Sequence, residues 1–272
     1  MLNRTYKIFS ILMVLFTSAV CSADESLKSK SEINKRFCSV AASAPMVKFE
    51  NTVLAKVYTI ISDKFLGNDI AAAEYQTLGK EAQVALGIEE QYHVPIKKLA
   101  PLLAAFPAVA FTMPGAIYVN EDRLKDQTYG AKRAVFFHEV VHRKYNDSTF
   151  GVLVEGGSVI GSGFLASELL SSLIRLPNLI HYPLVIMSAL YGMHFASSKF
   201  VNYRERRADI EGHYATQCSV CVQESANRRR KMVETEKNPL QNDGYLFADA
   251  LEKIAEDLKL ENKLCSHHGG VN

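Results

Sequence analysis

The sequence lacks an excess of charge of either sign. Its 31 Lys and Arg residues are nearly balanced by 29 Asp and Glu residues, which gives a formal net charge of +2 over 272 residues. Residues 1–23 hold Arg4 and Lys7 but no acidic residue, so the rest of the chain carries no net charge. Because nucleic-acid binding needs a basic surface that neutralises phosphates, the composition predicts no nucleic-acid partner.

Internal repeats, low-complexity tracts and a dense set of cysteines are also missing. Hydrophobic residues make up 48% of the chain and charged residues 22%, as in ordinary globular proteins. This composition excludes disorder, collagen and a coiled coil as descriptions of the whole chain. The length is enough for one sizeable domain, or two small ones, with a hydrophobic core.

The N-terminus has the pattern of a secretory signal peptide. Basic residues 1–7 precede apolar residues 8–20, and small residues follow up to Ala23. The apolar run is short for a membrane span and typical of a signal-peptide core. We therefore expect cleavage near Ala23 and a mature chain that is periplasmic or associated with the cell envelope. The alternative is an uncleaved N-terminal anchor.

Four cysteines follow the predicted signal peptide: Cys38, Cys218, Cys221 and Cys265. An even number in an oxidising compartment favours disulfide bonds, with three possible pairings. The alternative is a second zinc site formed by the last three cysteines with His267, because C-x-x-C is a common zinc-ligand spacing. We expect disulfide bonds that tie the C-terminal tail to the body of the protein.

The apolar pattern predicts an α+β protein that is mostly helical and has a small sheet. The expected helices span residues 26–69, 71–86, 134–145, 201–215 and 249–260. Between them, residues 106–111 favour β structure, Pro114-Gly115 is a turn signal, and residues 116–119 read as a strand. The basic run at residues 228–231 is expected to be a solvated helix face.

One short motif indicates a metal site. Residues 138–142 read His-Glu-Val-Val-His, and residues four apart on a helix share a face, so both imidazoles can reach one metal ion. Glu139 lies beside them and can act on a water molecule at the metal. Apolar neighbours bury the rest of the helix, which strengthens the effect of a metal on its water. The alternative is a buried helix with two hydrogen-bonded histidines.

A hydrolytic zinc site needs a third protein ligand and an open fourth position. A third histidine six residues further on is missing, because position 148 is serine, so we expect a distant carboxylate. Glu205 and Asp209 are spaced i, i+4; Glu205 is the expected ligand, and Asp209 is expected to accept the outer N–H of a ligating histidine. Other candidate ligands are Glu155, Glu168 and Glu211. The alternative is a surface salt-bridge helix.

Four segments match, in order, the motifs of one family. Residues 110–119 resemble N-A-F-x-x-P-G-G-x-I-x-V, and residues 134–142 resemble A-V-L-A-H-E-x-x-H. Residues 204–209 resemble R-E-x-x-A-D, and residues 250–255 resemble A-L-x-K-L/I-A. The chain thus resembles the HtpX and CAAX-prenyl-protease type of zinc metallopeptidases, which belong to the gluzincins.

The resemblance implies a zincin-like metallopeptidase domain at residues 105–272, with the helical segment 24–104 packed on it. It implies one Zn²⁺ per chain, bound by His138, His142 and Glu205, with Glu139 as general base. The implied substrates are unfolded or extended polypeptides of the envelope. We therefore expect a zinc metalloendopeptidase whose partners are protein or peptide substrates.

Two further parts of the expected site match the family less completely. We expect residues 116–119 to form an edge strand that pairs with extended substrate through backbone hydrogen bonds. The residues expected at this strand are Pro114, Gly115, Ala116, Ile117 and Tyr118. The family's downstream His-Pro followed by Arg is absent, and His267 or His268 is the expected substitute as transition-state stabiliser.

Two apolar stretches, residues 151–166 and 176–196, lie between His142 and Glu205. Because His142 and Glu205 must reach one ion, the chain between them crosses a bilayer zero or two times. Glu155 and the flanking basic residues disfavour two crossings. We expect either buried helices beside the site or a hairpin, within residues 151–197, that touches the membrane.

Two other functions stay open. A non-catalytic protein of the same fold could bind zinc, or could bind extended polypeptide as a chaperone does. A weaker alternative is a membrane-inserted assembly factor built on the two apolar stretches.

Overall fold

The structure is a computed structural model that describes residues 64–103, 108–173, 177–235 and 247–269, together with residues 56 and 60. The predicted signal peptide, Cys38 and nearly all of the helix expected at residues 26–69 lie outside these residues. The described chain divides into two compact units. One contains Thr149–Tyr203, and the other contains the described residues before Thr149 and after Tyr203.

The unit that carries the motifs is helical with one three-stranded sheet, so the predicted α+β class is confirmed. Its helices are α6 (Ala73–Ala85), α7 (Glu121–Leu124), α8 (Tyr129–Lys144), residues 204–215 of α10 (Asn178–Ala215), α11 (Ser219–Thr235) and α12 (Ala248–Leu260). Its strands are β1 (Ile96–Lys98), β2 (Ala110–Met113) and β3 (Ala116–Val119). Three 3₁₀ turns, η2 (Glu90–Tyr92), η3 (Pro101–Leu103) and η5 (Ser266–His268), complete the described elements.

The sheet has the order β1-β3-β2, with β3 parallel to β1 and antiparallel to β2. The turn at Pro114-Gly115 is confirmed: Gly115 has φ 91°, a conformation that glycine adopts readily. This turn folds β2 onto one side of β3, and β1 pairs with the other side. The prediction that residues 116–119 form an edge strand is therefore wrong, and the edges of this sheet are β1 and β2.

Helix α8 begins at a capped end and is held by its apolar residues. The Thr128 side chain accepts a hydrogen bond from the backbone N–H of Ala131, which satisfies one free donor of the first turn. The aromatic side chains of Phe136 and Phe137 are fully buried, as are Val140 and Val141. The helix contacts α6, β2 and α11. The motif helix is thus a core element, as the sequence predicted.

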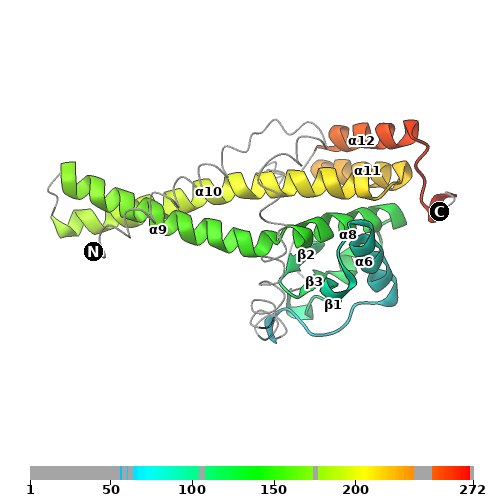
Figure 1. Ribbon diagram of the computed structural model, residues 1–272, viewed down its shortest axis with the longest axis horizontal. Helices are drawn as coiled ribbons and strands as arrows, with labels where there is room; N and C mark the ends of the chain where they lie inside the picture. Colours follow the sequence, from blue (N-terminus) through cyan, green and yellow to red (C-terminus); the bar gives the residue numbers. More distant parts are fainter. Residues whose placement is uncertain are drawn as a thin grey trace. The chain divides into compact units, whose positions relative to one another are not determined.

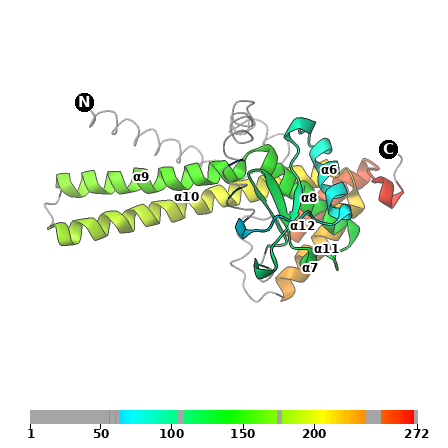
Figure 2. The same ribbon diagram turned by 90° about the horizontal axis from the view of Figure 1, so that it is seen from below.

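Helices α11 and α12 lie side by side (Figures 1 and 2). One apolar cluster joins them, formed by Val222, Ala226, Leu251, Ile254, Ala255 and Leu258. Because α12 is fixed against α11, the chain that follows α12 returns to the first turn of α11. There the backbone N–H of Ser219 donates to the carbonyl of Lys263 at 3.0 Å.

In the other unit, α9 (Asp147–Leu173) and α10 run antiparallel as a hairpin (Figures 1 and 2). Small residues form the contact: the Ser162 hydroxyl donates to the Ala189 carbonyl at 3.4 Å, and Gly163 lies against Ala189. Both helices are long and apolar enough to cross a membrane. The most apolar window of α10 has no buried residue, so the predicted alternative of two buried helices is wrong for α10.

Candidate metal centre

Three side chains that the sequence predicted as ligands converge in the structure. His138 Nε2 lies 3.0 Å from His142 Nε2 and 3.1 Å from Glu205 Oε2. His142 Nε2 lies 3.3 Å from the same oxygen. Donor atoms about 2.0–2.1 Å from a tetrahedral zinc ion stand about 3.3 Å apart, so one metal ion fits among these three atoms. All three residues are buried.

The close approach of α8 and α10 brings these ligands together. His138 and His142 lie one turn apart on α8, and Glu205 comes from α10. At Gly212 of α10, a Cβ atom would lie 3.0–3.1 Å from backbone atoms of His138 and Phe137. Such contacts are tighter than nearly all real ones and involve backbone that cannot move aside, so glycine at this position allows the two helices to meet.

Each histidine of the cluster is held through the ring nitrogen that points away from Glu205. His138 Nδ1 lies 2.8 Å from Asp209 Oδ1, and His142 Nδ1 lies 2.7 Å from Asp147 Oδ2. When each Nδ1–H donates to its carboxylate, the lone pair of each neutral Nε2 is left for a metal. Asp209 thus lies beside the outer nitrogen of a histidine, as the sequence predicted.

The role of Asp147 was not predicted from the sequence. Asp147 follows α8 after a break in which Asn146 adopts φ 53°, a left-handed conformation that asparagine tolerates. The break turns the chain, so that the first residue of α9 reaches back to His142, five positions earlier. A short acidic residue just after a helix-ending Asn is a signal that could have identified it.

Arginine side chains fix the two outer carboxylates. Arg229 lies 3.3 Å from Asp209 Oδ1, and Arg207 pairs with Asp147. Burial raises the pKa of Asp209, but the charge of Arg229 together with the charge and hydrogen bond of His138 outweighs burial, and the pKa is lowered. Burial also raises the pKa of Asp147, and Arg207 together with His142 lowers it. The prediction of a solvated face at residues 228–231 is therefore wrong for Arg229, which is turned into the site.

Without a metal, this cluster would hold protons. Burial lowers the pKa of His138, but the charge and hydrogen bond of Asp209, with Glu205, raise it to about 10. Burial also lowers the pKa of His142, but Glu205 and Asp147 raise it to about 9. Burial raises the pKa of Glu205, and the two histidines bring it well below its usual value. The three side chains therefore bind a cation, which is either a proton or a metal ion.

Glu139 is buried beside the cluster and is oriented by Thr112 of β2. The Thr112 hydroxyl lies 2.9 Å from Glu139 Oε2 and 2.8 Å from the Glu139 carbonyl oxygen, and its single hydrogen can serve one of them at a time. The Ser148 hydroxyl in turn donates to the Thr112 carbonyl at 2.8 Å. The edge strand nearest the site is thus β2, instead of the predicted strand at residues 116–119.

Of the other candidate ligands, Glu211 accepts hydrogen bonds from Lys144 and Tyr145 instead. Glu155 belongs to the hairpin unit, where it accepts a hydrogen bond from Ser197 at 2.9 Å, and Glu168 lies on the same helix. Within the described residues, the third donor beside the two histidines is Glu205.

Several expected site residues lie elsewhere. Pro114, Ala116, Ile117 and Tyr118 are buried, with β3 paired on both sides, so they offer no free edge to a substrate. His267 stacks on Tyr129 with ring centroids 3.9 Å apart. Tyr129 is nine residues before His138 on α8, about 13 Å along the helix axis. The structure therefore does not support a transition-state role for His267.

Three of the four cysteines for which disulfide bonds were predicted lie close together. Cys218, Cys221 and Cys265 are free thiols, and the sulfurs of Cys221 and Cys265 lie 3.7 Å apart. A disulfide bond joins sulfurs about 2.05 Å apart, so the predicted disulfide bonds among these three residues are wrong. His268, the other candidate stabiliser, lies among these sulfurs instead of at His138.

Comparisons with protein-family models, with curated proteins and with solved structures found no match to this chain.

Proposed function

We propose that the protein is a zinc-dependent endopeptidase. The observation that carries the proposal is the convergence of His138, His142 and Glu205, with each imidazole held by a buried carboxylate. Three protein ligands of nitrogen and oxygen leave one position open on a tetrahedral zinc ion, which is typical of hydrolytic rather than structural zinc sites. The four motif resemblances support the same family and a zincin-like fold.

When bound, zinc would polarise the scissile carbonyl group and lower the pKa of water. The Glu139 carboxylate, placed by the Thr112 hydroxyl, takes a proton from the attacking water. It then delivers that proton to the nitrogen of the leaving amine. Asp209 and Asp147 keep the two imidazoles in one tautomer and orientation, so that neither has to reorganise during the reaction.

The proposed substrates are extended polypeptides. Strand β2 pairs with β3 on one side, and its Thr112 contacts Glu139. A peptide in extended form could add to the other side of β2 by backbone hydrogen bonds, which places a peptide bond near Glu139. Recognition through backbone atoms gives weak sequence preference. This suits unfolded envelope proteins, the class that the resemblance implies.

We further propose that the hairpin contacts a membrane, in a protein exported by its N-terminal signal. Large apolar side chains on α10 are exposed, among them Leu179, Tyr182, Met187, Tyr191 and Phe195. On α9, only residues 156–167 separate Glu155 from Glu168, about 18 Å of helix against about 30 Å of hydrocarbon. The hairpin therefore lies partly in the bilayer instead of crossing it.

Flotation with liposomes tests the membrane contact. Met187→Glu combined with Tyr191→Glu places two charges one turn apart on the exposed surface of α10. We expect the lipid-bound fraction to decrease at least about tenfold, because a charged side chain in lipid is costly. Val233→Glu, at an exposed apolar residue of α11, is the control. Equal flotation of all three proteins would contradict the proposal.

The peptidase activity is tested with Glu139→Gln, which keeps the size of the side chain and removes its proton acceptor. We expect cleavage of an unfolded protein to fall at least about 100-fold, with zinc content unchanged, because general acid–base catalysis contributes about 10²–10⁴-fold. The assay compares digestion rates with zinc per chain. Equal cleavage by both proteins would exclude this mechanism.

Carboxylate variants test the ligand assignment in the same assay. Glu205→Ala is expected to lower both zinc content and cleavage, because it removes the third ligand. Glu155→Ala, which removes a carboxylate of the hairpin, is the matched control and is expected to change neither. Wild-type protein that holds zinc but digests nothing would instead favour the non-catalytic polypeptide binder.

A further inference from the structure

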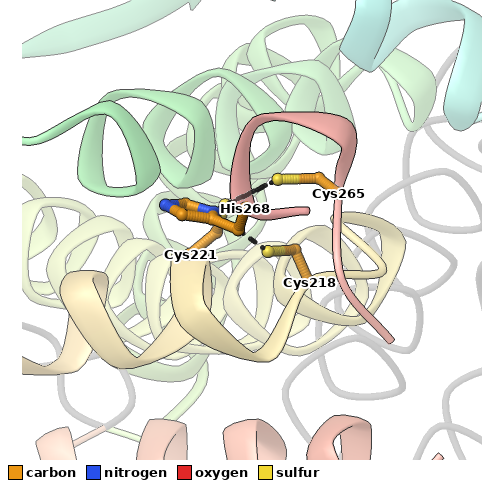
Figure 3. A group of neighbouring side chains, drawn as sticks. All are labelled: Cys218, Cys221, Cys265 and His268. Carbon is orange, nitrogen blue, oxygen red and sulfur yellow. Dashed lines mark hydrogen bonds between the residues drawn. The ribbon is translucent and has the colours of Figure 1, made fainter. Parts of the chain in front are cut away.

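A second cluster of ligand atoms lies at the start of α11, away from the residues of the proposed active site. Cys218, Cys221 and Cys265 point their sulfur atoms toward the imidazole of His268 (Figure 3). His268 Nδ1 lies 3.4 Å from Cys218 Sγ, 3.6 Å from Cys221 Sγ and 3.3 Å from Cys265 Sγ. All four ligand atoms lie within 4.8 Å of one another.

These distances match a tetrahedral zinc ion. Ligands at about 2.3 Å (sulfur) and about 2.0 Å (nitrogen) from zinc stand about 3.8 Å apart for two sulfurs and about 3.5 Å apart for sulfur and nitrogen. Cys221 Sγ and Cys265 Sγ are 3.7 Å apart, and the three sulfur–nitrogen distances lie between 3.3 and 3.6 Å. The sulfurs of Cys221 and Cys265 are thus too far apart for a disulfide bond and correctly spaced for one ion.

The local backbone explains the arrangement. Cys218 directly precedes α11 and Cys221 lies in its first turn, so a C-x-x-C pair spans the helix start. Cys265 precedes the 3₁₀ turn η5 and His268 ends it, so a C-x-x-H pair spans that turn. Two pairs with a spacing of three are the usual way in which zinc sites collect four ligands from two segments. The alternative zinc site predicted from the sequence included His267. In the structure the next residue, His268, supplies the nitrogen instead.

The surroundings suit a metal–thiolate cluster. The sulfurs of Cys218 and Cys221 are fully buried, and Arg133 Nη1 lies 3.8 Å from Cys221 Sγ. Three thiolates and one divalent ion leave one negative charge, which this guanidinium offsets. The other nitrogen of His268 lies 3.8 Å from Glu224 Oε1, and Glu224 also accepts the Gly130 N–H at 2.8 Å. A carboxylate beside the outer nitrogen is common around zinc-bound histidines.

We propose that Cys218, Cys221, Cys265 and His268 bind a second zinc ion, which has a structural role. Four protein ligands leave no open position, so this ion takes no part in hydrolysis. It fastens the segment after α12 to the start of α11 and, through Tyr129 and Gly130, to the start of α8. The site shares no residue with the first cluster, so either proposal can fail without the other.

X-ray absorption at the zinc edge tests the site in the full chain. The double variant His138→Ala/His142→Ala removes two ligands of the first cluster, and we expect it to retain one zinc per chain. The expected spectrum has three sulfur neighbours at about 2.3 Å and one nitrogen neighbour at about 2.0 Å. A zinc shell without sulfur, or no zinc at all, would overturn the proposal.

The neighbouring residues His267 and His268 provide a matched pair of variants, each added to the double variant His138→Ala/His142→Ala. His268→Ala is expected to release zinc to a chromogenic chelator at least about tenfold faster, because it removes a ligand. His267→Ala is expected to release zinc at the unchanged rate, because His267 supplies none of the four clustered ligand atoms, although its ring stacks on Tyr129 and meets the His268 ring edge to face. Equal rates would contradict the assignment.

Mass spectrometry of the unreduced wild-type protein gives an independent test, which does not depend on whether a cysteine variant folds. We expect Cys218, Cys221 and Cys265 to become alkylated only after a chelator removes zinc. A disulfide bond between any two of these cysteines in freshly purified protein would overturn the proposal and restore the disulfide prediction.

Discussion

The two metal-ligand clusters of this protein differ in donor number and donor type. The first has two imidazoles and a carboxylate, with a buried glutamate beside them. The second has three sulfurs and an imidazole, with a guanidinium beside them. Three ligands leave one position on the metal for a reacting molecule, whereas four close it. The comparison shows how coordination number separates a site suited to chemistry from one suited to fastening the chain.

The two clusters also differ in how the fold holds them. The first lies between α8 and α10, where its imidazoles are fixed by Asp209 and Asp147 and can hold protons when no metal is bound. The second joins a helix start to a chain segment near the C-terminus, beside the backbone hydrogen bond from Ser219 to Lys263, with Arg133 at Cys221 and Glu224 at His268. Without a metal, the first cluster keeps short hydrogen bonds between its imidazoles and buried carboxylates, whereas the two charged contacts of the second cluster are longer, at 3.8 Å each.

The largest expected difference is in stability. In the His138→Ala/His142→Ala variant, chelation would empty the cysteine cluster, and we expect the free energy of unfolding to fall by on the order of 5 kcal/mol. In His268→Ala, where the remaining zinc would lie at His138 and His142, we expect less than half that loss. Denaturant unfolding with and without chelator measures both. Equal losses would remove the distinction between the sites.

Without a metal, the stability that the first cluster contributes depends on pH. With no metal bound, the pKa values of His138 and His142 are raised from 6.5 to about 10 and about 9. The stability from their contacts with carboxylates is therefore complete below pH 6.5 and is lost as pH rises through 9 and 10. Zinc binding there needs deprotonated imidazoles, so zinc affinity rises over the same range.

Unfolding of His268→Ala measures this trend, because the proposed zinc of that variant lies in the first cluster. Without metal, its unfolding midpoint is expected to decrease from pH 6.5 upward. With zinc, the decrease is expected to be absent or reversed. A metal-free midpoint that does not change with pH would contradict the proton-holding role of the first cluster.

The smallest expected effect concerns the carboxylates behind the ligands. Asp209→Asn keeps the shape of the side chain but removes the charge that holds His138, and we expect zinc affinity at the first cluster to fall about 10–100-fold. Zinc at the cysteine cluster is expected to be unaffected. Asp257→Asn on α12, where the carboxylate accepts a partly buried hydrogen bond from the Tyr214 hydroxyl, is the control. Competition with a chelator of known affinity gives both values.

Local patterns predicted the main elements and the first cluster. Four-residue spacing placed His138 and His142 on one helix face, and the same spacing selected Glu205 and Asp209 on another. Local patterns failed where the answer depended on distant neighbours. Whether β3 lies at an edge depends on β1, which pairs with it from a separate part of the chain. Arg229 reads as a surface cation until α11 packs beside Asp209.

The sequence by itself determined the helical motif, its ligand types, the Pro114-Gly115 turn and the C-x-x-C pair, because each depends on residues within one or two turns. Only the tertiary structure decided that β2 is the edge strand beside Glu139, that Asp147 supports His142, and that His268 meets the three sulfurs. Those outcomes require close approach between segments that are distant in the sequence or separated by a turn. Spacing along the chain specifies which side chains share a face, whereas packing specifies which faces meet.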